Sequence, residues 1–267
     1  MRQQPDCHQA ERTLVRKIKR LAPAICAVLA AIGLAGTDAV AGCNDPAKAG
    51  VDWTDCNKKL LMLGGANLEK AIFTDANLTS TDFGGAQLQG ATLDLADVSY
   101  ASFKDANLTG ASMQKTAGNR SNFAGATMDN ANMDAIELFR ANFTGASLAG
   151  ANLSRASMPR SMFDDASLAG ANLEKSDMIR GSFKGANLSG AKLTFAILAR
   201  SEFAGAKLEG SDWSHTYLYR ARLQGVDLSG VTGLTSEQIA LACGDDATLL
   251  PPDVEKPERW PCNPQED

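Results

Sequence analysis

The sequence predicts an all-β solenoid whose coils have four sides of five residues each. From Leu63 to Leu228 every fifth residue is apolar, and Gly118 is the one exception. Phenylalanine recurs every twenty residues within this pattern, at Phe83, Phe103, Phe123, Phe143, Phe163, Phe183 and Phe203. Arginine forms a second such series, called here the Arg column: Arg120, Arg140, Arg160, Arg180, Arg200 and Arg220. Because twenty is four times five, four sides complete one coil, and the repeat spans about eight coils.

A period of five excludes the two regular elements. On an α-helix five residues rotate by roughly 500°, so successive apolar positions would scatter around the axis. On a flat strand an odd spacing sends alternate apolar positions to opposite faces. A chain that turns a corner every five residues buries all of them, because each side then offers one inward-facing centre.

Each five-residue unit also has a fixed chemistry around its apolar centre. A small residue, usually Ala, lies two positions before the centre, as in Ala66-Asn67-Leu68. A larger side chain there would overfill a narrow core. Glycine often lies two positions after the centre, as at Gly85 and Gly145. We expect a corner at that position, where a positive φ suits Gly.

The units Ala106-Asn107-Leu108 and Ala186-Asn187-Leu188 resemble those of the pentapeptide-repeat family, which read roughly A-(D/N)-L-x-x. The resemblance covers about 170 of the 267 residues. It implies a right-handed quadrilateral β-helix. It does not imply one function, because the family includes DNA-mimicking gyrase-binding proteins and effectors.

Residues 1–41 have the pattern of a secretory signal peptide. A basic stretch that includes Arg16 and Arg20 precedes an apolar run from Leu21 to Gly36, and Ala39-Val40-Ala41 gives an A-x-A cleavage site. We expect cleavage after Ala41 and a periplasmic or secreted protein. An uncleaved signal, which would anchor the chain to a membrane, stays open as an alternative.

The cysteines that remain after residues 1–41 are removed form one pair before the repeats and one pair after them. They are Cys43, Cys56, Cys243 and Cys262. Disulfides 43–56 and 243–262 would staple the two ends, and an oxidising compartment permits them. Val40-Ala41-Gly42-Cys43 also resembles a bacterial lipobox. Lipid on Cys43 is disfavoured because it would leave Cys56 without a partner.

The flanks of the repeat are expected to cap the solenoid, whose open ends expose core and unpaired backbone. We assign 42–60 to an N-terminal cap that includes Trp53, 61–230 to the solenoid and 231–267 to a C-terminal cap. Thr235-Ser236-Glu237-Gln238 reads as a capping box that opens a short helix through about Ala242. A Pro-rich tail with Trp260 follows. Such a helix also supports dimers in some relatives, so a monomer and a dimer both stay open, with a cap favoured.

Charge and residue types exclude several functions. The formal net charge is −5, and residues 1–41 hold six of the 26 Lys and Arg and three of the 31 Asp and Glu. The remainder therefore carries 20 basic and 28 acidic residues, or −8, which disfavours nucleic-acid binding. The chain has two histidines and lacks a metal-ligand spacing, a P-loop or a nucleophile elbow. We expect no enzyme, cofactor or metal site.

One side of the coil differs from the other three. This fourth side is centred on Leu78, Val98, Gly118, Leu138, Met158, Met178, Leu198 and Leu218, and we expect Gly118 to leave a void or to draw its neighbours inward. Its outward positions include Phe139, Pro159, Ile179, Ile197, Tyr217 and Tyr219, with Tyr100 near one end. The Arg column runs along one border, and Lys115, Arg155, Lys175 and His215 run along the other.

Apolar residues between basic borders are typical of an interaction surface. We therefore nominate the Arg column with Phe139, Ile179, Tyr217 and Tyr219 as partner-binding residues. A structural interpretation stays open, in which the arginines stack, cover apolar surface and bond corner carbonyls. Glu137, Asp177 and Glu202 are near enough in the pattern to compensate part of the column's charge.

The sequence thus favours an exported, non-enzymatic interaction or structural module of a bacterial cell envelope. Its partner would be a protein or an anionic envelope component. The main alternative is a DNA mimic that binds and protects a topoisomerase of the gyrase type, which suits an acidic chain but not a signal peptide or a basic column. An accessory subunit of an enzyme is a third hypothesis.

Overall fold

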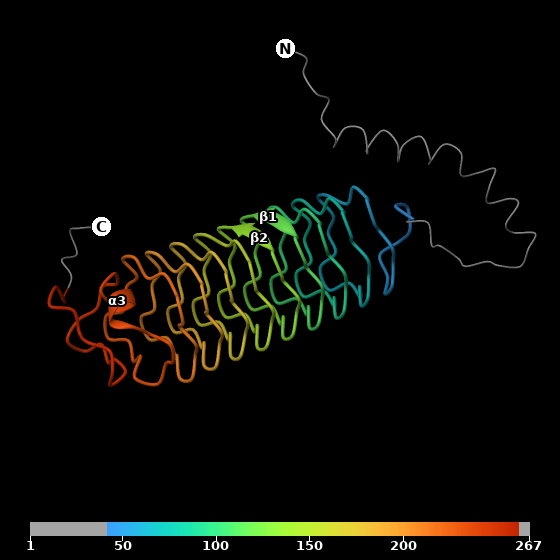
Figure 1. Ribbon diagram of the computed structural model, residues 1–267. Helices are drawn as coiled ribbons and strands as arrows, with labels where there is room; N and C mark the ends of the chain where they lie inside the picture. Colours follow the sequence, from blue (N-terminus) through green and yellow to red (C-terminus); the bar gives the residue numbers. More distant parts are fainter. Residues whose placement is uncertain (1–41, 262–267) are drawn as a thin grey trace, which may run out of the picture. The chain divides into compact units, whose positions relative to one another are not determined.

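The computed structural model describes residues 42–261, whose chain winds into stacked coils (Figure 1). Backbone bridges join residues twenty apart in parallel, for example Asp52 with Ile72, Asn107 with Thr127 and Glu202 with Arg222. Such bridges recur at every fifth residue, so each coil has the four sides that the spacing predicts. The handedness implied by the family resemblance stays a prediction. The predicted signal segment, 1–41, and Cys262 lie outside the described residues.

Most sides pair through one residue only, because the chain turns a corner immediately before and after it. Two strands of three residues stand out in the described part, β1 (Ala117–Asn119) and β2 (Glu137–Phe139). They run parallel on the fourth side, with Gly118 opposite Leu138. A Cβ added to Gly118 would lie 2.9 Å from Val98 Cγ2 and 3.1 Å from Leu138 Cδ2. The missing side chain is therefore compensated by neighbours that close in, the second of the two outcomes expected there.

The inward centres form one continuous core, and the phenylalanines form a stack within it. The seven rings of the Phe83–Phe203 series are buried, with successive centroids 4.8–5.1 Å apart and ring planes 3–6° from parallel. Other rings continue the stack at both ends, Phe73 edge-on to Phe83 at 5.9 Å and Trp213 against Phe203. Trp53 meets Phe73 edge-on at 5.7 Å, and Trp213 meets Phe203 at 5.5 Å. We call the side centred on this stack the Phe side.

Most corners are turns closed by one backbone hydrogen bond, as where the N–H of Ala66 donates to the carbonyl of Leu63 at 3.0 Å. At the corner of Arg140 the N–H of Ala141 donates instead to Ser161 Oγ at 3.1 Å. The third residue of the turn has a positive φ, and this position holds many residues other than Gly, including the whole Arg column. In many units an Asp or Asn stands before the centre and has a local role. Its side chain accepts the N–H two residues on, as Asp82 does from Gly84 at 2.9 Å.

Buried hydroxyls replace Ala at some of the small inward positions. Most of them bond to the coil before: Thr116 Oγ1 donates to the carbonyl of Leu93 at 2.7 Å, and Ser201 Oγ to that of Met178 at 2.8 Å. Ser211 Oγ instead donates within its own coil, to the carbonyl of Leu208 at 2.5 Å. The core tolerates most of these hydroxyls because they find an acceptor; Ser176 is an exception, since its buried Oγ has no hydrogen-bond partner among the described residues.

The first coil begins ten residues before the apolar repeat does. Trp53 is itself an inward centre, and its backbone N–H donates to the carbonyl of Ile72 in the next coil at 2.7 Å. The next centre is Lys58, which interrupts the apolar pattern. Its Nζ lies 3.7 Å from the centroid of the Trp53 ring, and burial lowers the pKa of this amine. The disulfide Cys43–Cys56 closes the loop before this coil, as predicted.

The C-terminal end is closed by α3 (Ser236–Ile239) and the segment after it. The predicted capping box is present, with Thr235 and Gln238 each accepting the other's backbone N–H. The helix ends at Ile239, three residues earlier than expected. The reason is that the chain then rejoins the coil ladder, where Arg220 N–H donates to the carbonyl of Leu241 at 2.7 Å and Leu223 N–H to that of Cys243 at 2.7 Å.

The tail packs over this last turn of chain. Trp260 is buried and its Nε1 donates to the carbonyl of Ala242 at 3.0 Å. Gly244 lies directly beneath the indole ring, where an added Cβ would collide with it. Cys243 is disulfide-bonded. The predicted pairing with Cys262 stays a prediction, because that residue is not among those described.

Candidate interaction surface

The Arg column lies at the corner where the fourth side meets the Phe side. All six arginines have φ between 55° and 60°, the left-handed region. The stacking of the coils imposes this conformation. The N–H of Arg120 donates to the carbonyl of Phe139 in the next coil at 2.8 Å, and that of Arg160 to the carbonyl of Ile179 at 2.8 Å. A left-handed residue other than Gly costs about 1–2 kcal/mol, so the backbone alone does not favour arginine here.

The guanidinium groups of the Arg column lack carboxylate partners. Within residues 42–261, none of the six has an ion pair or a side-chain hydrogen bond. Their recorded contacts are with aromatic rings. Arg140 Cζ lies 5.1 Å from the centroid of Phe139, and Arg220 Cζ lies 5.5 Å from that of Tyr219. The expected bonds to corner carbonyls are therefore not found in the described structure.

Two of the three carboxylates that were expected to compensate the Arg column are engaged elsewhere, and the third, Glu137, forms no ion pair with it in the described structure. Glu202 pairs with Lys184 at 2.5 Å and with Arg222 at 3.0 Å. Asp177 Oδ1 accepts the backbone N–H of Ile179 at 3.0 Å. The six positive charges thus remain available to a partner.

The opposite border of the fourth side is more nearly neutral. Arg155 pairs with Asp134 through two hydrogen bonds, of which Nε to Oδ1 measures 3.0 Å. The hydrogen bond from Arg155 lowers the pKa of the Asp134 carboxyl below its ordinary value. Lys175 pairs with Glu174 at 2.7 Å. The fourth side therefore has one unpaired basic border, not two.

Exposed apolar side chains gather on the fourth side near its C-terminal end. We call the group of Phe195, Ile197, His215, Tyr217 and Tyr219 the aromatic cluster. Its four apolar or aromatic members other than His215 are each 36–50% exposed. Phe195 stacks on His215 at 4.7 Å, and Tyr217 lies parallel to Tyr219 at 6.3 Å. Ile197 and Tyr217 are bridge partners in successive coils, so the cluster is continuous.

The structure brings most of the nominated residues to one surface and adds one that was missed. Phe139 is 37% exposed beside the Arg column, whereas Ile179 is half-buried and offers less area than expected. Phe195 was missed because it occupies a corner, not an outward position of a side. The signal that finds it is its spacing of twenty from His215. The fourth side is also hollowed around β1 and β2, where a cavity of about 270 Å³ lies between Gly118 and Pro159.

The repeats match a known family over most of the chain. The Pentapeptide repeats family matches with eight copies, over residues 63–99, 101–135, 136–173, 163–194 and 196–232. The chain belongs to the pentapeptide-repeat family. Members of this family are generally non-catalytic. A comparison with curated proteins gave no match.

Several solved pentapeptide-repeat structures resemble this one. HetL from the cyanobacterium Nostoc sp. strain PCC 7120, involved in the regulation of heterocyst differentiation, is 26% identical over 63% of this chain and 87% of its own, with a TM-score of 0.34. Full-length QnrB1, a plasmid-mediated fluoroquinolone resistance protein, is 20% identical over 70% of this chain and 92% of its own, with a TM-score of 0.37.

A third relative comes from the thylakoid lumen of Arabidopsis thaliana. It is 23% identical over 43% of this chain and 70% of its own, with a TM-score of 0.28.

No group of three or more His, Cys, Asp or Glu side chains in 42–261 is placed to hold a metal ion. In the same range there is no helix with the length and apolar character of a membrane span.

Proposed function

We propose that this chain is an exported, non-enzymatic interaction module of a bacterial cell envelope, and that its fourth side docks an acidic protein surface. The observation that carries the proposal is the combination of the unpaired Arg column with the exposed aromatic cluster. Interfaces are enriched in Tyr, Phe and Arg, and such residues supply most of the binding energy. The arginines would steer an acidic partner, and the rings would supply the apolar contact.

Export is supported by the chain before the first coil. Residues 1–41 have the charge and hydropathy pattern of a signal peptide. The Cys43–Cys56 disulfide is of the kind that persists in oxidising compartments. This disulfide also uses the Cys43 thiol that a lipid anchor would require, so a soluble mature protein that begins at Gly42 is preferred over a lipoprotein. N-terminal sequencing of the periplasmic fraction tests the site of cleavage.

The competing DNA-mimic function requires a surface that resembles the anionic duplex. The overall negative charge favours it. The Arg column opposes it, because six unpaired guanidinium groups run along one edge of the solenoid. Recovery of the protein from the cytoplasm with reduced cysteines would favour mimicry over an envelope function.

Crosslinking in intact cells tests the docking surface directly. A photoactivatable residue placed at Tyr217 should capture one acidic envelope protein. The matched control places it at Lys207, which is also exposed in the last coils but on the side centred on Leu188 and Leu208. Arg140→Glu combined with Arg180→Glu should abolish the product at Tyr217. Equal products at both positions, or a product that survives charge reversal, would contradict the proposal.

A further inference from the structure

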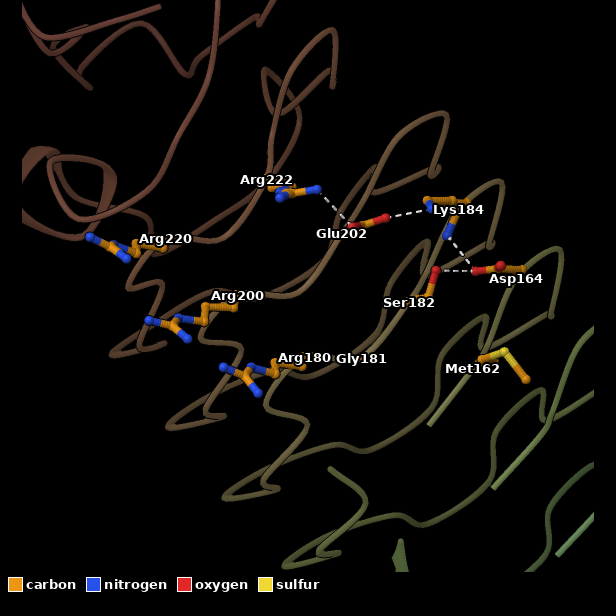
Figure 2. A pocket seen from close by; sticks show the side chains of 10 residues that line it. All are labelled: Met162, Asp164, Arg180, Gly181, Ser182, Lys184, Arg200, Glu202, Arg220 and Arg222. Carbon is orange, nitrogen blue, oxygen red and sulfur yellow. Dashed lines mark hydrogen bonds and ion pairs between the residues drawn. The ribbon is translucent and has the colours of Figure 1, made fainter. Parts of the chain in front are cut away.

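A groove lies on the Phe side, next to the Arg column and around the corner from the fourth side. Its volume is about 500 Å³, and it extends over the coils from Met162 to Arg222. One wall is formed by Arg180, Arg200 and Arg220. Figure 2 shows these three in a row that runs beside a second row, which contains Lys184 and Glu202; the guanidinium ends of the three arginines point away from that second row. Pockets of this size are typical of small-molecule sites.

The charged side chains of the opposite wall are linked to one another and to the backbone by ion pairs and hydrogen bonds. Glu202 accepts from Lys184 at 2.5 Å and from Arg222 at 3.0 Å, so one carboxylate holds two cations from the coils on either side. The hydrogen bond to Glu202 raises the pKa of the Lys184 amine. Asp164 accepts from Ser182 Oγ at 2.5 Å and from the backbone N–H of Lys184 at 3.1 Å. Both carboxylates are thereby committed to the protein.

The groove as a whole is strongly basic. Five cationic side chains line it against two carboxylates. The three arginines of the first wall have no ion pair in the described structure. Successive arginines are one coil apart, which is about 4.8 Å in a parallel β-stack. Because their backbones are fixed by the coil ladder, the three side chains leave the chain at regular intervals along one edge.

We propose that this groove binds a small multivalent oxyanion, with two or more phosphate or carboxylate groups about one coil apart. Guanidinium forks bind either group through paired hydrogen bonds, and successive arginines can each take one group. Lys184 and Arg222 place additional charge across the groove. The ligand, the side of the coil and most of the residues differ from those of the protein-docking surface, so this site does not rest on the proposed function.

The N-terminal half of the Arg column provides a matched comparison. Arg120 and Arg140 have the same corner conformation, with φ of 55° and 57°, and the same lack of ion pairs. The outward residues beside them on the Phe side are Asn122 and Asn142, which carry no charge. They do not line the groove.

Isothermal titration calorimetry on the disulfide-closed protein tests the proposal, with tripolyphosphate and citrate as probes in separate titrations. Binding of at least one probe is expected at physiological salt, and the two probes distinguish phosphate from carboxylate ligands. Arg180→Gln with Arg200→Gln should weaken binding by about a hundredfold, roughly tenfold for each lost charged hydrogen-bond donor. Arg120→Gln with Arg140→Gln should weaken it less than about threefold, because salt screens distant charges.

Two further variants separate this site from its alternatives. Arg200→Lys keeps the charge but loses the fork, and should still weaken binding by about tenfold. Phe195→Ser, in the aromatic cluster but outside the groove, should leave anion binding intact while it removes the protein product crosslinked from position 217, so the two proposals can fail independently. Failure of the wild-type protein to bind either probe, or equal losses in the two arginine pairs, would overturn the assignment. Circular dichroism confirms that each variant keeps its β-structure.

Discussion

Replacing Phe143 with alanine tests whether the stacked phenylalanines hold neighbouring coils together. The Phe143 ring is buried and lies 4.8 Å from Phe123 and 4.9 Å from Phe163, within 4° of parallel to both. Truncation of a buried phenylalanine destabilises a protein by about 3–5 kcal/mol. Two aromatic contacts are lost here, each worth about 0.5–1.5 kcal/mol beyond area burial. The expected loss is therefore in the upper part of the range, about 4–5 kcal/mol.

Leucine substitutions separate stacking from the filling of space. Phe143→Leu keeps a branched apolar side chain like that of Leu148 on the next side, and loses only the ring contacts, about 1–3 kcal/mol for two pairs. Combining it with Phe163→Leu should show a coupling of about 0.5–1.5 kcal/mol, because these rings touch. Combining it with Phe183→Leu, two coils away, should show a coupling near zero.

Urea denaturation followed by far-ultraviolet circular dichroism measures all of these values, with the slope of the transition checked for constancy. The reasoning would be refuted by equal coupling in the adjacent and the distant pair. A loss below about 2 kcal/mol for Phe143→Ala would also refute it, since that value is smaller than the burial of the ring alone requires.

Three further perturbations test the end cap, the corners and the acid response. Cys43→Ser with Cys56→Ser opens a loop with a sequence separation of 13 and should lower the free energy of unfolding by about 3 kcal/mol, with hydrogen exchange rising first in the initial coil. At the corners, Gly145 has φ 65° and open space around it, so Gly145→Ala should lower the free energy of unfolding by about 1 kcal/mol. Ala135 has φ 54°, so Ala135→Gly should raise that free energy by about 0.5–1 kcal/mol. If the two variants shifted the denaturation midpoint in the same direction, a backbone strain common to all corners would be disproved. Hydrogen bonds within the folded chain lower the pKa of Asp212 below its ordinary 3.8, so its contribution is present above that value and is lost as the pH falls through the folded pKa. In Asp212→Asn the free energy of unfolding should therefore fall less steeply between about pH 5 and pH 2 than in the wild type. An unchanged slope over that pH range would contradict this.

Much of the fold could be predicted from the five-residue register, because an apolar centre in a chain that turns every five residues is buried only when it faces inward. An apolar residue every fifth position must face inward, so the buried Phe side and the corners followed from spacing alone. The capping box at Thr235 was predictable because its two hydrogen bonds are local. The start of the first coil was not, since Lys58 occupies an inward position, where its amine lies over the Trp53 ring and near the charge of Asp45.

The candidate surfaces were less accessible to sequence reasoning, because they depend on which charges find one another. The position of the Arg column at a corner beside the fourth side followed from the period of twenty. Whether it was neutralised did not, because Glu202 lies equally near Lys184, Arg222 and the column in the sequence pattern. Its choice of Lys184 and Arg222 leaves the arginines unpaired and closes the far wall of the groove. Side-chain pairing across coils carries no periodic signal.

The uniform corner has a consequence for how such a protein can change its surface by insertion and deletion. Removing twenty residues takes out one whole coil, and every later residue keeps its place around the axis. Removing five residues, such as 146–150, also keeps each later centre facing inward, but it turns everything beyond it by a quarter of a revolution. Arg160 and the later arginines would then no longer line up with Arg120 and Arg140, and the groove would face another direction. With the core intact, the surface of the later coils can therefore take four orientations around the axis relative to the earlier coils. The number of five-residue units removed or inserted between them determines which orientation is taken.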